Sequence, residues 1–376
     1  MPAPDPVVTF DRHLSRKPVS SSERTRMMSE PGFGDVHTDH MVLVDWSKTD
    51  GWHSARIVAY APLQLDPATA VLHYGHSVFE GMKAFRQVDG GIAIFRALDH
   101  ARRFRRSAHR LGLPELPEET FIAALEALVR EDHAWVPSAA AHSLYLRPLL
   151  FGSHVGIGFR PTWQAQFMVI ACPVAPFFAG TKAVSVWICE EYSRAALGGT
   201  GDVKCGGNYA AAILAESDAA KNGCDEVVWL DAVERRWVEE LGGMNLFFVL
   251  GAGEGAKLLT PALTGTILPG NTRDALLKLA SDLGIHAEEG RLSVEDWQAG
   301  ANSGLITEVF ACGTAAVVTP VGSVKSSRGA WTMGTGAPGP VTLKLRQTLL
   351  DVQYGRTPDS HQWMHRLTGI PAQPIR

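Results

Sequence analysis

Short apolar segments alternate with amphipathic segments along this chain, and a stretch with two prolines divides the series in two. Strands are predicted over residues 41–46, 56–60, 92–95, 143–151, 166–172, 183–189, 225–230 and 245–250. Helices are predicted near residues 99–111, 117–128, 208–221, 271–283 and 341–353. This alternation indicates two α/β domains that are joined near residue 175.

The dividing stretch, residues 172–180 (CPVAPFFAG), suits neither a helix nor a strand interior, because proline lacks a backbone N–H. A chain of 376 residues is also too long for one typical core. We therefore predict a weakly structured arm at 1–35, a small α/β domain at 36–172, a linker at 173–182 and a second domain at 183–376.

Composition and charge exclude several kinds of partner. Hydrophobic residues make up 45% of the chain and charged residues 20%, which is ordinary for a globular protein. The net charge of -4 gives no attraction for nucleic acid or anionic membranes, so five arginines between residues 102 and 110 are interpreted as a solvated helix face. No apolar run approaches the roughly 20 residues that a transmembrane helix needs. The five cysteines form no CxxC pair and no signal-peptide core is present, so a cytoplasmic location is expected.

Several local patterns resemble known sites without the context that those sites require. Residues 251–256 (GAGEGA) fit a dinucleotide fingerprint, but Pro261 follows too closely for the helix it needs, so a hairpin is expected. Residues 198–204 (GGTGDVK) lack the ending of a phosphate loop. The HxxH spacings at 37–40 and 73–76 suit hydrogen-bonded histidines better than a metal site, and no metal is expected.

A lysine, Lys204, lies in a glycine-rich loop just before a helix, within residues 201–209 (GDVKCGGNY). Asn208 is expected to cap that helix, and the glycines let a bulky group approach the backbone. A lysine that forms an imine needs a protected site that holds its amine unprotonated when it attacks. On these residues alone a surface lysine is the commoner alternative. The choice between a surface lysine and an imine-forming lysine therefore depends on the remaining motifs.

Eight short motifs follow one another along the chain. They are LHYG (72–75), FEGMKAF (79–85), SLYLRP (143–148), DVKCGGNY (202–209), ELGGMN (240–245), ILPGNTR (267–273), GTA (313–315) and QYG (353–355). In order and spacing they resemble the motifs of branched-chain aminotransferases, from Phe33 to about Tyr354. The resemblance implies fold type IV of the pyridoxal-phosphate enzymes, an α/β fold with a smaller N-terminal domain, a larger C-terminal domain and pyridoxal 5'-phosphate between them.

The resemblance assigns the cofactor chemistry to three residues. Lys204 matches the Schiff-base lysine, which also moves the proton between substrate and cofactor. Glu240 matches the carboxylate that faces the pyridine nitrogen, where an anion keeps that nitrogen protonated and makes the ring an electron sink. Its neighbour Glu239 is excluded, because adjacent strand positions point to opposite faces. Tyr209 matches the phenol beside the cofactor's ring oxygen.

Four residues are implied for the cofactor's phosphate. Arg96 matches a phosphate ligand, and its forked guanidinium suits that anion. Asn271 and Thr272 follow a Pro-Gly pair at the start of a predicted helix, where free backbone amides form an anion site whatever the side chains are. This matters because Asn271 departs from the apolar residue common in relatives. Thr314 matches a residue whose hydroxyl touches the phosphate.

The resemblance implies that a ring of aromatic side chains surrounds the substrate's side chain. The matching aromatics are Phe33, Tyr74, Phe79 and Tyr145. Such a ring selects leucine, isoleucine and valine by apolar burial, at about 0.8 kcal/mol per CH₂. Arg147, with Tyr74 and Tyr145, is a candidate for tolerating the side-chain carboxylate of glutamate, and Thr314 with the Ala315 amide would receive the substrate's own carboxylate. Core packing is the alternative for each aromatic taken singly.

The implied activity is a ping-pong transamination, in which leucine, isoleucine or valine gives its amino group to 2-oxoglutarate. The products are a branched 2-oxo acid and glutamate, and relatives are homodimers. Two alternatives stay open, namely another fold-type IV enzyme (a D-amino acid aminotransferase or an aminodeoxychorismate lyase) and a non-catalytic cofactor carrier. Gly243 replaces a threonine of some relatives, and Ala316 and Thr319 replace the CxxC pair of vertebrate relatives.

Overall fold

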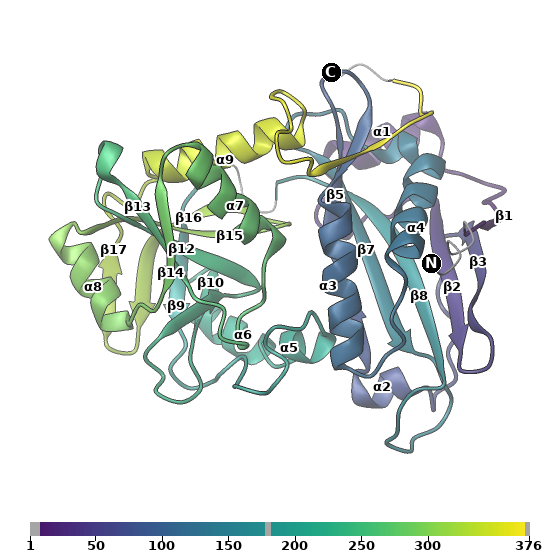
Figure 1. Cartoon of the computed structure of the whole chain (residues 1–376), viewed down its shortest axis with the longest axis horizontal. Coiled ribbons are helices and arrows are strands. Elements are labelled where there is room, and N and C mark those ends of the chain that lie inside the picture. The colour runs from purple at the N-terminus through teal and green to yellow at the C-terminus, as the bar shows by residue number, and fades with distance from the viewer. Residues whose placement is uncertain (1–7, 177–181, 373–376) are drawn as a thin grey trace, which may run out of the picture. The chain divides into compact units, whose positions relative to one another are not determined.

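A computed structural model describes residues 8–176 and 182–372 (Figure 1). Residues 1–7 of the predicted arm and residues 177–181 of the predicted linker lie outside the described residues. Within the described ranges, no helix is both long and apolar enough to cross a membrane.

The chain divides into two compact units. The first unit is Met1–Ala175 together with Gln353–Arg376, and the second unit is Pro176–Val352. The C-terminal segment belongs to the first unit because β18 (Met364–Leu367) pairs with β6 (Ile92–Phe95). The sequence prediction instead places residues 353–376 in the second domain, since local patterns carry no information about such a long-range return. The two units are therefore similar in length.

The first unit is built on one sheet with the strand order β1-β3-β2-β8-β7-β5-β6-β18, and β4 pairs with β7. Its other strands are β1 Asp11–His13, β2 His40–Ser47, β3 Gly51–Ala59, β4 Ser77–Phe79, β5 Met82–Arg86, β7 Ser143–Gly152 and β8 Gln164–Val174. Its helices are α1 Ser21–Ser29, α2 Ala70–Tyr74, α3 Ala97–Arg110 and α4 Glu118–Glu131, with a 3-10 turn at His133–Trp135. Only the β1–β3 pair is parallel among the described strands of this sheet. The five strands predicted before the break are confirmed.

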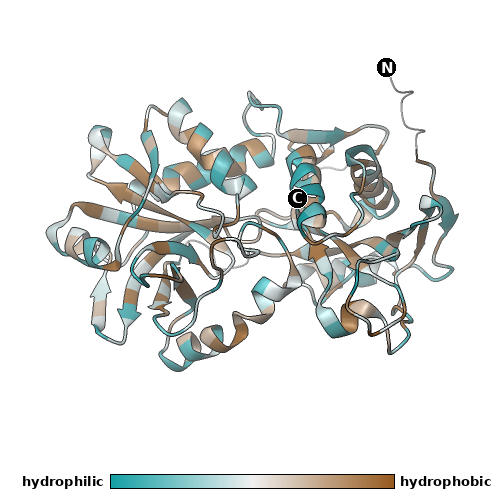
Figure 2. Cartoon of the chain, turned by 60° about the horizontal axis from the view of Figure 1, so that its bottom comes forward, coloured by the Kyte–Doolittle hydropathy of each residue, from teal (hydrophilic) through white to brown (hydrophobic). Residues whose placement is uncertain are grey.

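The core of the first unit lies between α3, α4 and the sheet. Phe104 of α3 packs on Phe121 of α4 and on Phe167 of β8, with ring centroids 5.2 and 5.6 Å apart. In Figure 2 the hydrophobic colour is concentrated on the strands, whereas the helices carry both colours. The predicted solvated arginine face of α3 is present at Arg102 and Arg105, which pair with Glu118 and Glu115. The prediction is wrong for Arg103, which is 3% exposed and pairs with the buried Glu80.

Three local predictions for the first unit are wrong. The arm contains helix α1, whose N-cap Ser20 accepts a hydrogen bond from the Glu23 N–H, so the overlooked signal is the Ser-x-x-Glu capping pair. Asp99 does not cap α3. The N-cap is Arg96, and Asp99 lies in the first turn. Strand β8 also runs through Pro173, which is tolerated because β2 pairs with β8 only as far as Val169.

The second unit contains a closed ring of six strands, in the order β11-β10-β9-β16-β15-β12 and back to β11. These strands are β9 Val184–Ile188, β10 Glu226–Leu230, β11 Val238–Leu241, β12 Met244–Leu250, β15 Ile306–Gly313 and β16 Val317–Ser326. Strands β13 Lys257–Pro261, β14 His286–Gly290 and β17 Gly329–Thr332 extend this barrel. The helices are α5 Gly206–Ala210, α6 Ile213–Lys221, α7 Asn271–Asp282, α8 Val294–Ser303 and α9 Pro340–Gln353.

The barrel core is apolar and aromatic. Trp297 of α8 is fully buried and meets Phe248 and Trp331 edge to face, with ring centroids 5.1 and 5.7 Å apart. The predicted hairpin is confirmed, because β12 and β13 pair antiparallel around the short 3-10 turn Gly253–Gly255. The glycine-rich run in that hairpin therefore opens no helix.

Two partly buried carboxyl groups face each other beside the β11–β12 turn. A Cβ on Gly242 would lie 2.2 Å from Glu226 Oε2 and 3.5 Å from Glu216 Oε1, so both carboxyls gather against this glycine. Burial, and secondarily the Glu216 carboxyl, raise the pKa of Glu226 to about 8. Because the pKa of Glu226 is higher in the folded state than in the unfolded state, the folded state holds this proton more tightly. The stability that this gives is therefore present at low pH and is lost as the pH rises toward 8.

The Glu226→Gln substitution is expected to remove that pH dependence. When the pH is raised from about 5 to about 8.5, the free energy of unfolding of the variant should rise by roughly 1–3 kcal/mol relative to that of the wild type. Urea unfolding at both pH values measures the difference, with the exposed Glu254→Gln as the matched control. An identical pH dependence in the wild type and in Glu226→Gln would contradict this assignment.

Candidate active site

Lys204 lies in a loop that the side chain of Asn208 stabilises by hydrogen bonds. The Lys204 Nζ donates to Tyr209 Oη at 2.9 Å. Asn208 is not the cap of a long helix, since it lies inside the short helix α5. Its buried side-chain amide donates to the carbonyls of Thr200 and Val203 at 2.7 and 2.9 Å, and so closes the loop that presents Lys204.

Glu240 is a buried carboxylate on β11 with a defined set of partners. It is 2% exposed and accepts hydrogen bonds from the Leu268 N–H at 2.8 Å and from Asn245 Nδ2 at 3.1 Å. Its other oxygen pairs with Arg194 Nη2 at 2.7 Å. Burial raises the pKa of Glu240 to about 7, while the positive charges of Arg194 and Lys204 act to lower it. Lys204 and Glu240 are thus within electrostatic reach of each other.

Glu239 and Glu240 have different partners. Glu239 accepts a hydrogen bond from the Thr266 hydroxyl, whereas Glu240 contacts Arg194 and Leu268. The pairing of β10 with β11 shifts register at Glu239, because Trp229 pairs with Glu240 and Leu230 with Val238, and this irregularity accompanies the different partners of the two glutamates. Of the two, Glu240 is the carboxylate whose pKa the Lys204 charge acts to lower.

Asn245 brings the glutamate, the start of α7 and the β15–β16 turn together. Its side-chain amide bonds both Glu240 and the Leu268 carbonyl, and its backbone pairs with Cys312 two residues before Thr314. A Cβ on Gly270 would lie 2.0 Å from Asn245 Oδ1, so only glycine fits there. Helix α7 starts directly after this glycine, which has no side chain to cap it. The backbone N–H groups of its first turn, at Asn271 and Thr272, therefore present the positive end of the helix to an anion.

The first unit gathers four of the predicted substrate residues. Phe33 meets Tyr145 edge to face at 5.0 Å, and the Arg147 guanidinium lies over Phe79 at 4.9 Å and over Tyr145 at 5.4 Å. Arg147 Nη2 also donates to Tyr145 Oη at 3.1 Å. A Cβ on Gly81 would lie 1.8 Å from that phenol oxygen, so the glycine after Phe79-Glu80 makes room for Tyr145.

Tyr74 and Arg96 have other partners. Tyr74 is 44% exposed, stacks edge to face on Phe159 and donates to the Ile157 carbonyl. Arg96 is buried with a left-handed backbone (φ 53°), and its Nε donates to Asp99 at 2.6 Å. Such a conformation costs a non-glycine residue roughly 1 kcal/mol and is retained where the surrounding structure holds it.

Arg194 is a member of the site that the sequence interpretation missed. Its Nη2 bonds Glu240 and the carbonyls of Gly201 and Thr266, at 2.7, 3.0 and 2.6 Å. It therefore ties the Lys204 loop to the glutamate and favours the ionised form of that carboxylate. A single arginine ten positions before the lysine carries no local signal of its own.

The Arg194→Ala substitution is expected to make Glu240 harder to ionise. Without the paired guanidinium, the acid limb of the kcat–pH profile should move upward by about one pH unit or more. Arg194→Lys, which keeps the charge, should recover most of the shift. If the acid limb of Arg194→Ala coincides with that of the wild type, Arg194 does not set the charge on Glu240.

Comparisons with known proteins agree with this geometry. Residues 77–324 match the amino-transferase class IV family. A "Probable branched-chain-amino-acid aminotransferase" of Streptomyces coelicolor is 53% identical over 361 residues, 96% of this chain and 99% of the relative. A "Branched-chain-amino-acid aminotransferase" of Mycobacterium tuberculosis is 53% identical over 352 residues, 93% of this chain and 96% of the relative.

A solved structure extends the likeness to three dimensions. The T.th. branched-chain amino acid aminotransferase complexed with N-(5'-phosphopyridoxyl)-L-glutamate superposes with a TM-score of 0.69 at 31% identity, covering 86% of this chain and 98% of that chain. The family match and the likeness of the fold make this chain a class IV aminotransferase of fold type IV. Within that class it belongs to the branched-chain-amino-acid aminotransferases, which confirms the predicted family.

Proposed function

We propose that Lys204, Tyr209 and Glu240 form the catalytic centre with which this chain transaminates branched-chain amino acids. The enzyme transfers the amino group of leucine, isoleucine or valine to 2-oxoglutarate and gives the 2-oxo acid and glutamate. One observation supports this centre most strongly. The Lys204 amine lies 2.9 Å from a phenol and within electrostatic reach of a fully buried carboxylate.

These groups fit pyridoxal 5'-phosphate, the cofactor of this class. The site offers an amine for its aldehyde, a phenol for its ring oxygen, the buried Glu240 for its ring nitrogen and the start of α7 for its phosphate. When bound, the cofactor supplies the electron-withdrawing ring that stabilises negative charge at the substrate Cα. Thr314, in the turn after β15, is proposed as a further phosphate ligand, and Arg96 as another.

Four residues of the protein are proposed to carry out the remaining steps of catalysis. Lys204 holds the cofactor at rest, and its released amine takes the proton from the substrate Cα. Tyr209 accepts a hydrogen bond from Lys204 Nζ and so positions the lysine, and its phenol O–H would donate to the ring oxygen of the bound cofactor. Glu240 keeps the ring nitrogen protonated, and Arg194 keeps Glu240 charged.

The substrate side chain is proposed to meet the cluster in the first unit. Phe33, Phe79 and Tyr145 supply apolar area, and the Arg147 guanidinium beside them can receive the second carboxylate of glutamate. Tyr74 is proposed to join this cluster, and Thr314 with the Ala315 N–H to bind the α-carboxylate. A cytoplasmic homodimer is the proposed working form.

Amino-donor profiling tests the function. With 2-oxoglutarate as acceptor, L-leucine, L-isoleucine and L-valine should react with kcat/KM values within about 200-fold of one another, because one methylene gives a pocket no more discrimination than that. D-alanine should give at most about a thousandth of the leucine rate. Preferential use of D-alanine would contradict the substrate assignment and leave the cofactor assignment standing.

A further inference from the structure

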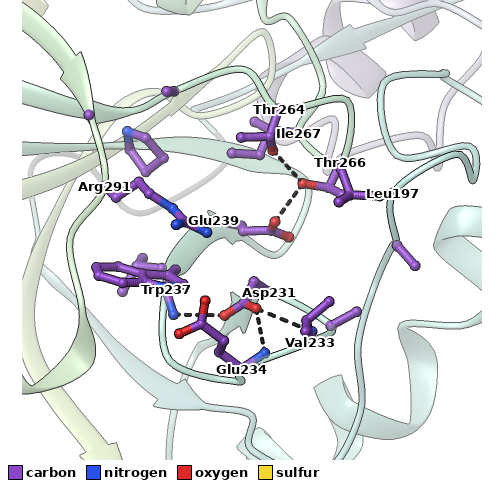
Figure 3. Close-up of a pocket in the computed structure, with 16 residues that line it drawn as sticks. Leu197, Asp231, Val233, Glu234, Trp237, Glu239, Thr264, Thr266, Ile267 and Arg291 are labelled. Atoms are coloured by element: carbon purple, nitrogen blue, oxygen red, sulfur yellow. Dashed lines mark hydrogen bonds between the residues drawn. The ribbon is translucent and has the colours of Figure 1, made fainter.

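The barrel of the second unit has a cavity on the side of β11 that Glu239 faces. Its volume is about 290 Å³, room for roughly ten water molecules at about 30 Å³ each. Apolar side chains form much of its wall, including Ala196, Leu197, Val233, Pro261 and Ile267. Figure 3 shows the Glu239 carboxylate between Thr266 on one side and Arg291 and Trp237 on the other.

This cavity is separate from the centre around Lys204. Glu239 lines the cavity, whereas neither Lys204 nor Glu240 does. The catalytic role proposed above uses none of the groups that face it. Thr266 touches both sides, because its hydroxyl donates to Glu239 and its carbonyl accepts from Arg194.

Glu239, which lines this cavity, has a buried acceptor without a donor in the described part of the chain. The side chain is 7% exposed, its Oε1 accepts from Thr266, and no donor among the described residues lies within hydrogen-bond distance of its Oε2. A buried carboxylate oxygen without a donor is unfavourable, so a ligand that donates to it recovers free energy. Burial raises the pKa of Glu239 for the same reason.

A ligand whose positive group binds Glu239 can also carry a negative group, because Arg291 and the Trp237 N–H can receive it. Arg291 is exposed, has its guanidinium 4.5 Å over the Trp237 ring and is close enough to lower the pKa of Glu239 electrostatically. Trp237 Nε1 is buried with no acceptor among the described residues. Asp231 is already engaged, since it accepts the backbone N–H groups of Val233, Glu234, Arg236 and Trp237.

We propose that this cavity binds a second amino acid molecule as a zwitterion with an apolar side chain. Its ammonium donates to Glu239 Oε2, its carboxylate meets the Arg291 guanidinium and the Trp237 N–H, and its side chain packs on the apolar wall. The Glu239 carboxylate and the Arg291 guanidinium, which lie beside each other in Figure 3, are the complement of an α-amino acid's two charged groups, since both of these are bonded to one carbon. A simple amine would leave Arg291 and Trp237 without a partner.

Calorimetric titration of the holoenzyme after borohydride reduction tests the site. Reduction fixes the cofactor on Lys204, so added amino acid cannot react there, and a failure at Glu239 is not confused with a failure of the proposed function. The probes are L-leucine, 3-methylbutylamine, which lacks its carboxylate, and 4-methylpentanoate, which lacks its ammonium. We expect L-leucine to bind at least about tenfold more tightly than either analogue, since each lacks one charge-assisted contact of about 1.5–3 kcal/mol.

Variants assign the binding to the cavity. Glu239→Gln keeps the size of the side chain and an oxygen for Thr266, and should weaken leucine binding at least about tenfold. Arg291→Ala, at an exposed position that does not threaten folding, should do the same, whereas Glu234→Gln at the cavity rim should bind as the wild type does. Equal leucine affinity in the wild type, Glu239→Gln and Arg291→Ala would overturn the proposal. So would the absence of leucine binding at millimolar concentration, or tighter binding of the amine than of leucine.

Discussion

The Lys204→Ala variant is expected to lose at least about 10⁴-fold in kcat/KM for L-leucine, because one side chain serves as both cofactor anchor and proton carrier. A positioned acid–base group contributes about 10²–10⁴-fold by itself, and the covalent attachment adds to that. The loss corresponds to roughly 5 kcal/mol of transition-state stabilisation. The visible absorbance of the lysine-bound cofactor should disappear in the same variant.

Steady-state rates and the absorbance spectrum of the loaded protein measure this effect together. Lys221→Ala is the matched control, since Lys221 lies on α6 of the same unit, and it is exposed and pairs only with Asp218 among the contacts described. This control should keep its rate and spectrum. Transamination at the wild-type rate by Lys204→Ala would remove the lysine from the mechanism.

The second large effect is expected at Glu240. Glu240→Gln keeps the volume of the side chain but removes the negative charge that holds the ring nitrogen protonated, so kcat should fall by about 10²–10³-fold. Arg194 would then face a neutral partner, and the buried cation adds to the penalty. Binding of the cofactor should persist, because Lys204 and the start of α7 are unchanged.

The neighbouring carboxylate gives the sharpest comparison. Glu239 is as buried as a core residue and lies one position away, but it bonds Thr266, whereas Glu240 pairs with Arg194. The loss of kcat in Glu240→Gln should exceed that in Glu239→Gln at least about tenfold. Equal losses would mean that burial of any charge on β11, and not its direction, matters for the rate.

Long, periodic segments were predictable, because their residues satisfy the geometry of a strand or helix by themselves. Strand β6 and helix α7 begin at the predicted residues, and the hairpin of β12 and β13 follows from Pro261. The arm was misjudged because its helix depends on the Ser20–Glu23 cap and not on an apolar face, since no residue of α1 is buried.

The site residues were predictable only where a motif carries them. Lys204, Tyr209 and Glu240 lie in short matched motifs, and the structure adds how Asn208 and Asn245 hold those motifs in place. Arg194 pairs with Glu240, which is distant from it in sequence. Glu80 pairs with His100 and Arg103 of another element and so anchors the Phe79–Phe85 motif. Such contacts arise from the folded chain and leave no periodic signal.

The assignment of the cofactor to Lys204 can be measured without any variant. Borohydride reduction of the holoenzyme, followed by proteolysis and mass spectrometry, should find the phosphopyridoxyl group on the peptide that contains Lys204 and on no other peptide. Labelling of a different lysine, with the Lys204 peptide recovered unmodified, would contradict the account of this active site.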